Sequence, residues 1–334
     1  MSAPEIPQTP GAGPDLRVHL AGVPLRHPVL NASGTFDVLA ASATLDHDYV
    51  HDFPFSAYVP KTITPEPRAG NPPPRVTETP SGMVNAIGLE NPGAAEFARR
   101  LPELAELREP LFVSVGGSRI EDYAAVVRTV EERLGAAGPL PQVAGYELNV
   151  SCPNVASGIA IGSDPAEVER LLAAVRPLTD RALIVKLTPN VTAVAPVAAA
   201  AAAAGADAVS LVNTFKAMVL DPATLTPFLG NRTGGLCGPA VKPIALRMVA
   251  EVAEAVDLPL VGMGGIVSGL DVLEFIACGA TAVAVGAAVF ADPRAPERIV
   301  DELAAEMAAR GIAALAEIRG KALRRLPPPT PGPR

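Results

Sequence analysis

The sequence predicts an α/β protein, a (β/α)8 TIM barrel in which eight short strands alternate with eight helices. Two observations support this fold. Runs rich in Val, Ile and Leu recur along the chain, and several are almost continuously apolar, which is typical of parallel strands covered on both faces. Longer segments rich in Ala, Leu, Glu and Arg lie between most of these runs. A doubly wound sheet, which usually has about five or six strands, is the alternative.

The expected elements follow in a regular order. Residues 18–25, VHLAGVPL, predict a hairpin that closes the bottom of the barrel. The predicted strands are residues 27–34, 57–62, 111–117, 145–151, 183–188, 208–213, 259–265 and 282–288. The predicted helices are residues 38–50, 93–107, 120–134, 165–178, 191–204, 240–256, 268–278 and 295–310. Asp164 followed by Pro165 is typical of a helix N-cap and its first helical residue.

We expect one barrel domain over residues 16–326, with tails rich in Pro and Gly at 1–15 and 327–334. Hydrophobic residues make up 49% of the chain and charged residues 19%, which excludes a disordered protein. Two connections are long, from residue 62 to 91 and from 214 to 239. Long connections in a compact domain are usually binding loops or lids.

Composition also excludes some functions. The net charge is −8, Trp is absent and aromatic residues make up 4%, so a nucleic-acid partner is not expected. The three cysteines are far apart, which fits neither a disulfide framework nor a zinc site and indicates a reducing compartment. The apolar stretch 193–204 is too short to span a bilayer, and the polar, Pro-rich start is no secretory signal. We therefore expect a cytoplasmic protein without membrane contact.

Polar residues and glycines occur where the predicted strands end, and a barrel of this kind places its active site there. These residues are Asn31, Ser33, Lys61, Ser114, Asn149, Cys152, Asn154, Lys186, Asn213, Thr214, Gly264, Gly265 and Gly286. Lys61 and Lys186 stand in apolar strands, and a buried lysine is costly unless an anion or dipole meets it. Two such lysines suggest a bound anionic ligand. The alternative is a salt bridge to a neighbouring carboxylate.

The ends of the last two strands, GMGGI and AVGAA, are rich in small residues, and each leads into a helix. Such loops let backbone N–H groups approach a phosphate, and barrels frequently bind one at this location. Cys152 lies in NVSCPN just after a strand, whereas Cys237 and Cys278 are expected to be inert buried residues. All four histidines fall in the first 51 residues, so none is near Cys152 in sequence. Proton abstraction is therefore a better expectation for Cys152 than acyl transfer.

Several motifs together resemble the class 1 dihydroorotate dehydrogenases, flavin enzymes of pyrimidine biosynthesis. They are NASGTF (31–36), KTIT (61–64), GNPPPRVTETPSGMVNAIGLENPG (70–93), ELNVSCPN (147–154), VKLTPNVT (185–192), TGGLCGPAVKPIAL (233–246) and GMGGI (262–266). The resemblance runs from about residue 17 to 320. The two long connections are most similar to the 1B branch, whose catalytic subunit works with an iron–sulfur flavoprotein.

The resemblance implies FMN as cofactor and a site across the top of the barrel. The implied contacts to its ring and ribityl chain are Ser33, Lys61, Thr62, Ser114, Asn149, Lys186, Val212 and Gly238. Gly264, Gly265, Gly286 and Ala287 would surround its phosphate. The implied substrate-binding residues are Lys61, Asn85, Ala86, Ile87, Gly88, Leu89, Asn149, Asn154, Asn213 and Thr214. Cys152 would be the base, and no metal site is implied.

The resemblance further implies oxidation of dihydroorotate to orotate by a homodimer, working with an FAD and iron–sulfur electron-transfer subunit. Dihydroorotate is an anion with amide-like edges, which a lysine and several carboxamides can satisfy. Lys186 near the flavin would stabilise negative charge on the reduced ring. Two other functions stay open: a flavoenzyme similar to dihydropyrimidine dehydrogenase, and a flavin-free barrel that binds a phosphate.

Three features depart from the 1B pattern. Ser114 stands where that branch usually has Asn, and the ending ALAEIRGKALRRL is also more similar to the 1A branch. Ala287 replaces a usual Thr beside the phosphate, which removes one hydroxyl donor. The branch determines the electron acceptor, NAD through a partner subunit in 1B and fumarate in 1A.

Overall fold

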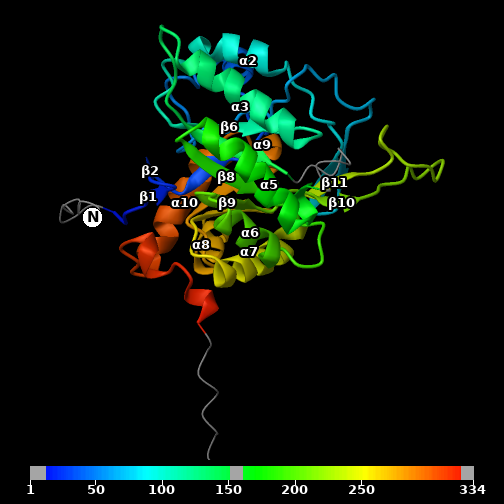
Figure 1. Ribbon diagram of the computed structural model, residues 1–334. Helices are drawn as coiled ribbons and strands as arrows, with labels where there is room; N and C mark the ends of the chain where they lie inside the picture. Colours follow the sequence, from blue (N-terminus) through cyan, green and yellow to red (C-terminus); the bar gives the residue numbers. More distant parts are fainter. Residues whose placement is uncertain (1–12, 151–160, 325–334) are drawn as a thin grey trace, which may run out of the picture.

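Seven parallel strands form the centre of the computed structural model, which describes residues 13–150 and 161–324 (Figure 1). Their order across the sheet is β3, β13, β12, β9, β8, β7, β6, and every neighbouring pair is parallel. The first strand thus lies beside the last, as it does when a sheet closes into a barrel. The strands are β3 (Val29–Asn31), β6 (Leu111–Val115), β7 (Val143–Asn149), β8 (Ala182–Lys186), β9 (Ala208–Leu211), β12 (Leu260–Met263) and β13 (Ala282–Val285). The predicted (β/α)8 barrel class is confirmed.

The predicted second strand, residues 57–62, is not a regular strand. Two isolated parallel bridges join this stretch of chain to β6. On its other side, the Asn31 side-chain amide donates to the Val59 carbonyl at 2.7 Å and accepts from the Val59 N–H at 2.8 Å. Pro60 has no N–H to give to a ladder, which explains why regular pairing is interrupted. The segment still fills the place between β3 and β6 and closes the barrel.

Helices surround the strands and cover their outward faces (Figure 1). The helices are α1 (Val38–Leu45), α2 (Ala94–Arg100), α3 (Ile120–Leu134), α5 (Pro165–Val175), α6 (Ala195–Ala203), α7 (Lys242–Ala255), α8 (Gly269–Ala277), α9 (Ala288–Ala291) and α10 (Ala295–Ala309). Short 3-10 helices lie at Leu101–Leu104, Arg176–Leu178, Pro239–Val241, Leu315–Glu317 and Lys321–Leu323.

Each predicted helix is found, but α2 ends at Arg100 and α6 begins at Ala195, so the predictions 93–107 and 191–204 were too long. The predicted helix 38–50 ends at Leu45, because Asp46 takes a left-handed φ of +50° that breaks the helical hydrogen bonds. The short helix α9 was not predicted. The predicted start of α5 is confirmed: the Asp164 side chain accepts the Ala166 N–H at 3.0 Å, and Pro165 is the first helical residue.

The barrel has an outer core between strands and helices and a separate interior core. The interior core contains side chains from facing strands, among them Phe112, Ile184 and Val261. Leu20 and Leu25 join this interior core from the hairpin of β1 (Val18–Leu20) and β2 (Val23–Leu25). The hairpin therefore closes the amino-terminal end of the barrel, as the sequence predicts, and leaves the carboxyl ends of the strands for a site.

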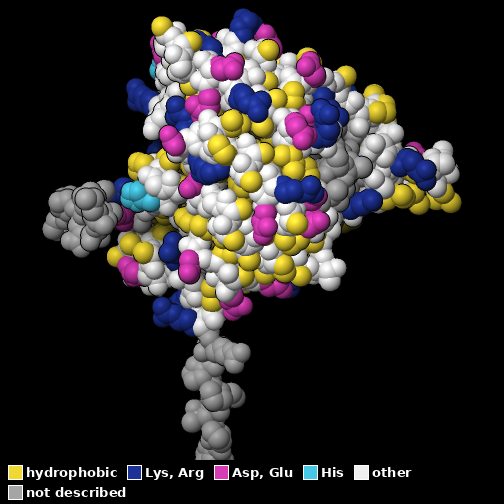
Figure 2. Space-filling model, viewed as in Figure 1, with side chains coloured by type: hydrophobic (Ala, Val, Ile, Leu, Met, Phe, Trp, Pro, Cys, Tyr) yellow, Lys and Arg dark blue, Asp and Glu magenta, His cyan; other side chains and the backbone are white. Residues whose placement is uncertain are grey.

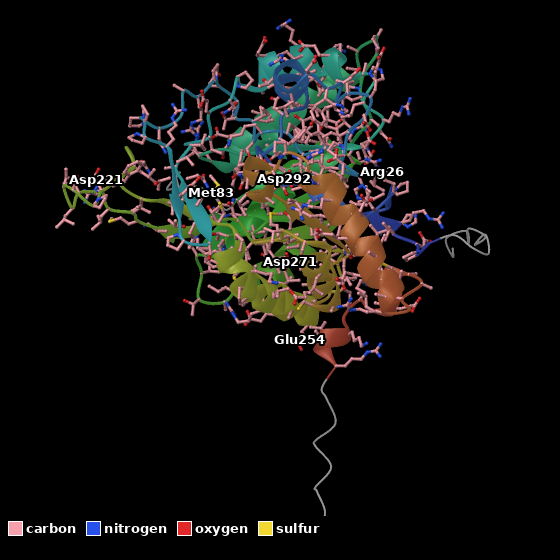
Figure 3. All side chains as sticks on the ribbon, turned by 180° about the vertical axis from the view of Figure 1, so that it is seen from behind. Arg26, Met83, Asp221, Glu254, Asp271 and Asp292 are labelled. Atoms are coloured by element: carbon pink, nitrogen blue, oxygen red, sulfur yellow. The ribbon has the colours of Figure 1, made fainter. Side chains whose placement is uncertain are left out.

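The two long connections form a second, antiparallel sheet, which we call the cap sheet. Its strands are β4 (Val76–Thr79), β5 (Gly82–Asn85), β10 (Phe215–Ala217) and β11 (Gly234–Cys237), in the order β10, β11, β5, β4. A small apolar cluster of Val84, Ala86 and Leu229 supports it. Figures 1 and 3 show the chain between β10 and β11 extending outward as an arm, with Asp221 near its outer end.

Charged side chains of both signs are mixed over the face of the molecule seen in Figure 2. Within residues 13–150 and 161–324, no helix has the length and apolar character needed to cross a membrane.

Candidate active site

The predicted site residues that the structure describes come together at the carboxyl ends of the barrel strands. Ser114, Asn149 and Lys186 lie in the last two positions of β6, β7 and β8. The remaining positions follow a strand or stand in the segment that closes the barrel: Ser33, Lys61, Thr62, Val212, Asn213, Thr214, Gly264, Gly265, Gly286 and Ala287. Because carboxyl ends of parallel strands meet at one end of a barrel, residues more than 250 positions apart lie at the same end of the molecule.

A hydrogen-bonded network built around the Thr62 hydroxyl links four of these residues. The Thr62 oxygen lies 3.2 Å from Ser33 Oγ and 2.9 Å from Ser114 Oγ. It also accepts a hydrogen bond from Asn149 Nδ2 at 3.0 Å. Thr62 and Ser114 are buried, with 3% and 0% of their surface exposed. The serine that departs from the 1B pattern is thus a full member of this network.

The network continues to the residues after β9. Asn213 Nδ2 donates to Asn149 Oδ1 at 3.3 Å, and the Asn213 oxygen accepts the Thr214 N–H at 2.7 Å. These contacts fix which end of each amide carries the oxygen. From the outer side of β7, the buried Tyr123 hydroxyl donates to the Asn149 carbonyl at 3.0 Å. Tyr123 was not predicted, because its role depends on α3 packing against β7.

The two lysines differ in environment. Lys186 is 5% exposed, and its Nζ lies 3.5 Å from Oε1 of Glu147, which is also 5% exposed. For Lys186, the salt-bridge alternative raised by the sequence is therefore present. Lys61 is only half-buried and packs against the β3–α1 loop, where a Cβ on Gly34 would lie 2.6 Å from Lys61 Cδ and 3.1 Å from Nζ.

Glu147 is a site residue that the sequence analysis missed. Its other oxygen, Oε2, accepts a hydrogen bond from Ser210 Oγ at 2.9 Å, and Ser210 is fully buried. The available signal was a lone acidic residue within the apolar strand GYELNV. What the sequence could not supply was the register that brings this carboxylate beside Lys186.

The glycines after β12 form a close turn against the start of α7. Gly264 and Gly265 have φ of +127° and +79°, values that side chains rarely adopt. A Cβ on Gly265 would lie 2.8 Å from the Gly238 carbonyl oxygen, so no larger residue fits without a shift of backbone. At Gly286, a Cβ would meet Ala32 and Thr35 at ordinary contact distances of 3.4 and 3.5 Å. These loops present backbone without side chains, which suits a phosphate group.

The Asp271 side chain stabilises the loop after β12 by hydrogen bonds to its backbone. Its Oδ2 accepts the N–H groups of Val267 and Ser268 at 2.8 and 2.9 Å, and its Oδ1 accepts from Lys242 Nζ at 2.5 Å. Burial alone would raise the pKa of Asp271, but the hydrogen bonds from Lys242, Val267 and Ser268 outweigh it and lower the pKa. The ionised Asp271 carboxylate thus stabilises the loop, and it also neutralises part of the Lys242 charge.

The predicted substrate-binding run Asn85–Leu89 continues from β5 of the cap sheet. Asn85 Nδ2 donates to the Gly235 carbonyl at 3.3 Å, across the pairing of β5 with β11. The Ala86 N–H donates to the Arg75 carbonyl, so that donor is used inside the cap. Gly88 and Leu89 have positive φ values of +80° and +56°, and Leu89 Cδ1 lies 3.9 Å from where a Cβ on Gly116, directly after β6, would stand. The cap sheet therefore carries this run to the same end of the barrel as the other site residues.

Two predicted residues, Cys152 and Asn154, lie outside the described residues. The two described cysteines are partly buried free thiols. Burial raises the pKa of Cys237 to about 11 and also raises the pKa of Cys278, so both are protonated near neutral pH. Residues 13–150 and 161–324 hold no group of three or more His, Cys, Asp or Glu side chains that could bind a metal ion.

Known proteins are similar to this chain over most of its length. The family model for dihydroorotate dehydrogenase matches residues 15–307. The chain is 47% identical over 309 residues to the dihydroorotate dehydrogenase B (NAD(+)) catalytic subunit of Pelobacter propionicus, covering 92% of this chain and 98% of the relative. Catalytic subunits of the same name from Geotalea uraniireducens and Geobacter sp. strain M21 are 45% and 46% identical, with the same coverage.

Proposed function

This chain belongs to the dihydroorotate dehydrogenase family, and we propose that it is the catalytic subunit of a class 1B enzyme that oxidises dihydroorotate to orotate with FMN. One observation carries the proposal: the similarity covers nearly the whole of relatives named as NAD-linked catalytic subunits. The same names favour dihydroorotate over the neutral ring of a dihydropyrimidine. They also favour the 1B branch, although Ser114 and the end of the chain are more similar to 1A.

The chain's own residues fit the cofactor. Gly264, Gly265, Gly286 and Ala287 would hold the phosphate of FMN through backbone groups, without the hydroxyl that a Thr at 287 would supply. Residues that would hold the ring and ribityl chain are Ser33, Lys61, Thr62, Ser114, Asn149, Lys186, Val212 and Gly238. An ammonium has three N–H donors, and Glu147 occupies one of those of Lys186. When bound, FMN supplies the acceptor for the hydride that leaves C6 of dihydroorotate.

The substrate proposal follows from the donors and acceptors at the barrel end. Lys61 would bind the carboxylate of dihydroorotate, since it is the half-buried lysine on the β3–α1 side. Asn149 and Asn213, whose amide orientations are fixed by Thr62 and the Thr214 N–H, would bind the amide edges of the ring. Asn85, Asn154, Thr214 and the run from Ala86 to Leu89 would complete the site.

Cys152 is proposed as the base that takes the C5 proton. A thiolate can take this proton while the hydride leaves C6, so the ring loses one proton and one hydride, two hydrogens in all, and orotate results. Among the described groups, Glu147 is engaged by Lys186 and Ser210, and the thiols of Cys237 and Cys278 have raised pKa values. These observations support an acceptor in the NVSCPN segment.

We further propose a homodimer that passes electrons to a separate subunit carrying FAD and an iron–sulfur cluster. The relatives are named as catalytic subunits of NAD-linked enzymes, which implies another subunit in those proteins. This chain has three cysteines, fewer than the four that hold a [2Fe–2S] cluster in ferredoxins. A partner must therefore supply the cluster if electrons are to reach NAD. A cytoplasmic location fits a pathway of soluble metabolites.

The decisive experiment is anaerobic mixing of the FMN-loaded protein with L-dihydroorotate, followed by flavin absorbance. We expect the absorbance to bleach in wild type and the rate to fall about ten- to hundredfold in Lys61→Ala, because a charge-assisted hydrogen bond contributes about 1.5–3 kcal/mol. Lys321→Ala, at an exposed position far along the chain, is the control. A protein that takes up no FMN would refute the oxidoreductase proposal. Wild-type rates in Lys61→Ala would refute the role of Lys61.

A further inference from the structure

We propose that Glu147 is a positioning residue, whose carboxylate holds the Lys186 ammonium at the barrel end and sets the charge that the cofactor meets there. This inference rests on the proposed function, because the proposed function is what places Lys186 beside FMN. The residues of the pair come from neighbouring strands, β7 and β8, and Ser210 of β9 completes the group.

Strand register explains the geometry. Lys186 is in register with Asn149 on one side and with Ser210 on the other. Glu147 lies two residues before Asn149, so its side chain starts on the same face of β7 but one layer deeper in the barrel. From there its carboxylate contacts both residues of the next layer: Oε1 lies 3.5 Å from Lys186 Nζ, and Oε2 accepts from Ser210 Oγ at 2.9 Å.

The pair is balanced in charge but loose in contact. An N–H to carboxylate hydrogen bond is ordinarily about 2.7–2.9 Å long, so at 3.5 Å Glu147 holds the ammonium mainly by charge and forms only a weak hydrogen bond with it. Within the described residues, Glu147 is the one carboxylate at ion-pair distance from Lys186. Both side chains are 6% exposed, so water screens the pair little. An ammonium in this state can turn its other N–H groups toward an electron-rich ligand above it.

The carboxylate therefore acts on the cofactor through the lysine. Reduction places negative charge on the flavin ring, and a cation beside that charge favours the reduced form. Glu147 offsets part of the lysine's field, so it moderates the reduction potential. Its loss leaves one uncompensated positive charge, which should make bound FMN easier to reduce.

The test is the reduction potential of bound FMN at about pH 6.5, measured by equilibration with a reference dye. In Glu147→Gln we expect the ratio of reduced to oxidised FMN at a fixed potential to rise at least tenfold, or about 30 mV for two electrons. Lys186→Gln should shift the ratio in the opposite direction. The double variant, which removes both charges, should lie between them, and Glu147→Asp should shift the ratio less than Glu147→Gln.

Glu131→Gln is the matched control. Glu131 lies on α3, on the outer side of β7, where its carboxylate accepts from the hydroxyls of Tyr146 and Thr179 at 2.8 and 2.6 Å. This variant removes an equally well-bonded carboxylate that packs from α3 against the opposite face of β7, so the potential should not move. A purely structural role for Glu147 would change stability and FMN retention but not the potential.

The outcomes separate this inference from the proposed function. If wild-type protein binds no FMN, the proposed function fails before Glu147 is tested. If wild type binds FMN and is reduced by dihydroorotate, an unchanged or lowered potential in Glu147→Gln overturns the inference alone. Should Glu147→Gln not fold, the double variant and Glu147→Asp decide: equal potentials in wild type, Lys186→Gln and the double variant would also overturn it.

Discussion

A thiol accepts a proton only as its thiolate, and the surroundings of each cysteine control how much thiolate is present. Apolar burial favours the neutral thiol, as Cys237 and Cys278 show. An unperturbed thiol has a pKa of about 8.5, so only a few per cent is ionised at neutral pH. The proposed base, Cys152, should therefore make the enzyme pH-dependent.

Cys152→Ser should reduce bound FMN orders of magnitude more slowly than wild type near pH 7, with partial recovery at high pH. Serine keeps the size and hydrogen-bonding capacity, but its hydroxyl is a much weaker acid and a poor base at this pH. Rapid-mixing absorbance with dihydroorotate gives the rate, and the wild-type rate should rise with pH as the thiol ionises. Cys237→Ser and Cys278→Ser are controls that should behave as wild type. A wild-type rate in Cys152→Ser would assign the base elsewhere.

His27 should make the stability of the fold depend on pH. This residue is 6% exposed, and its Nδ1 accepts the Val29 N–H at 3.2 Å. Burial, together with the charge of Arg26, lowers the pKa of His27 to about 3. An unfolded histidine has a pKa of about 6.5, so the unfolded state takes up the proton first. The contribution of His27 is complete above pH 6.5 and is lost as the pH falls toward 3, by about 2 kcal/mol at pH 5.

Urea unfolding at about pH 7, 6 and 5 measures this effect. His27→Asn keeps an acceptor for the Val29 N–H but cannot take up a proton, so its free energy of unfolding should fall less between pH 7 and 5. His19→Asn, at an exposed position in β1, should keep the wild-type pH dependence. Equal pH dependence in His27→Asn and wild type would contradict the assignment.

At the scale of elements, the loop between β12 and α8 is the most constrained part of the proposed phosphate site. Gly265→Ala should weaken FMN binding at least about tenfold. The new Cβ would lie 2.8 Å from the Gly238 oxygen and 2.9 Å from Lys242 Cβ, so the loop must move. Fluorescence titration of apoprotein with FMN gives the Kd.

Gly311→Ala separates this displacement from simple backbone strain. Gly311 also has a positive φ, +65°, but no atom lies within 4 Å of a Cβ built there. Both variants bear the cost of a left-handed conformation, about 1–2 kcal/mol. Only Gly265→Ala should change the Kd, and equal Kd values in the two would remove the β12–α8 loop from the phosphate site.

Elements with a strong local signal were predictable from sequence, and those that depend on distant partners were not. The helix 120–134 is found with the predicted bounds, because its apolar spacing and its acidic first turn are local features. The segment 57–62 was predicted as a strand from its apolar character, but Pro60 and the Asn31 side chain replace regular pairing. The cap sheet was predicted only as two long loops, since β5 and β11 meet across about 150 positions.

In the candidate site, too, the positions that follow from a local rule were predictable and the contacts between distant residues were not. The rule that sites lie at the carboxyl ends of barrel strands located Lys61, Asn149 and Lys186 without a structure. The rule could not say that Thr62 is the centre of the hydroxyl network, since its bonds join residues 87 positions apart. Glu147 was missed for a related reason: its function depends on a neighbour 39 positions away.

At the scale of the whole molecule, the proposed function makes the chain one part of an electron-transfer system. The purified chain should be reduced by dihydroorotate but should not reduce NAD at a useful rate, because its three cysteines cannot form a four-cysteine cluster. Steady-state NADH formation, with and without an FAD and iron–sulfur subunit, measures this. Efficient NADH formation by the chain alone would contradict the proposal. Efficient turnover with fumarate would instead place the enzyme in the 1A branch, to which Ser114 is also more similar.

The pairing of β5 with β11 also has a kinetic consequence. Val84 is in register with Leu236, so these two strands can join only after the intervening chain has been brought into place. Contacts between such distant residues form late in folding, because the entropy of closing a long loop must be overcome first. The cap sheet is also supported by a small apolar cluster, so it should open without global unfolding. Native-state hydrogen exchange should find the amides of β5 and β11 less protected than those of β8. A substrate could then enter through the least protected part of the molecule while the barrel beneath it stays folded.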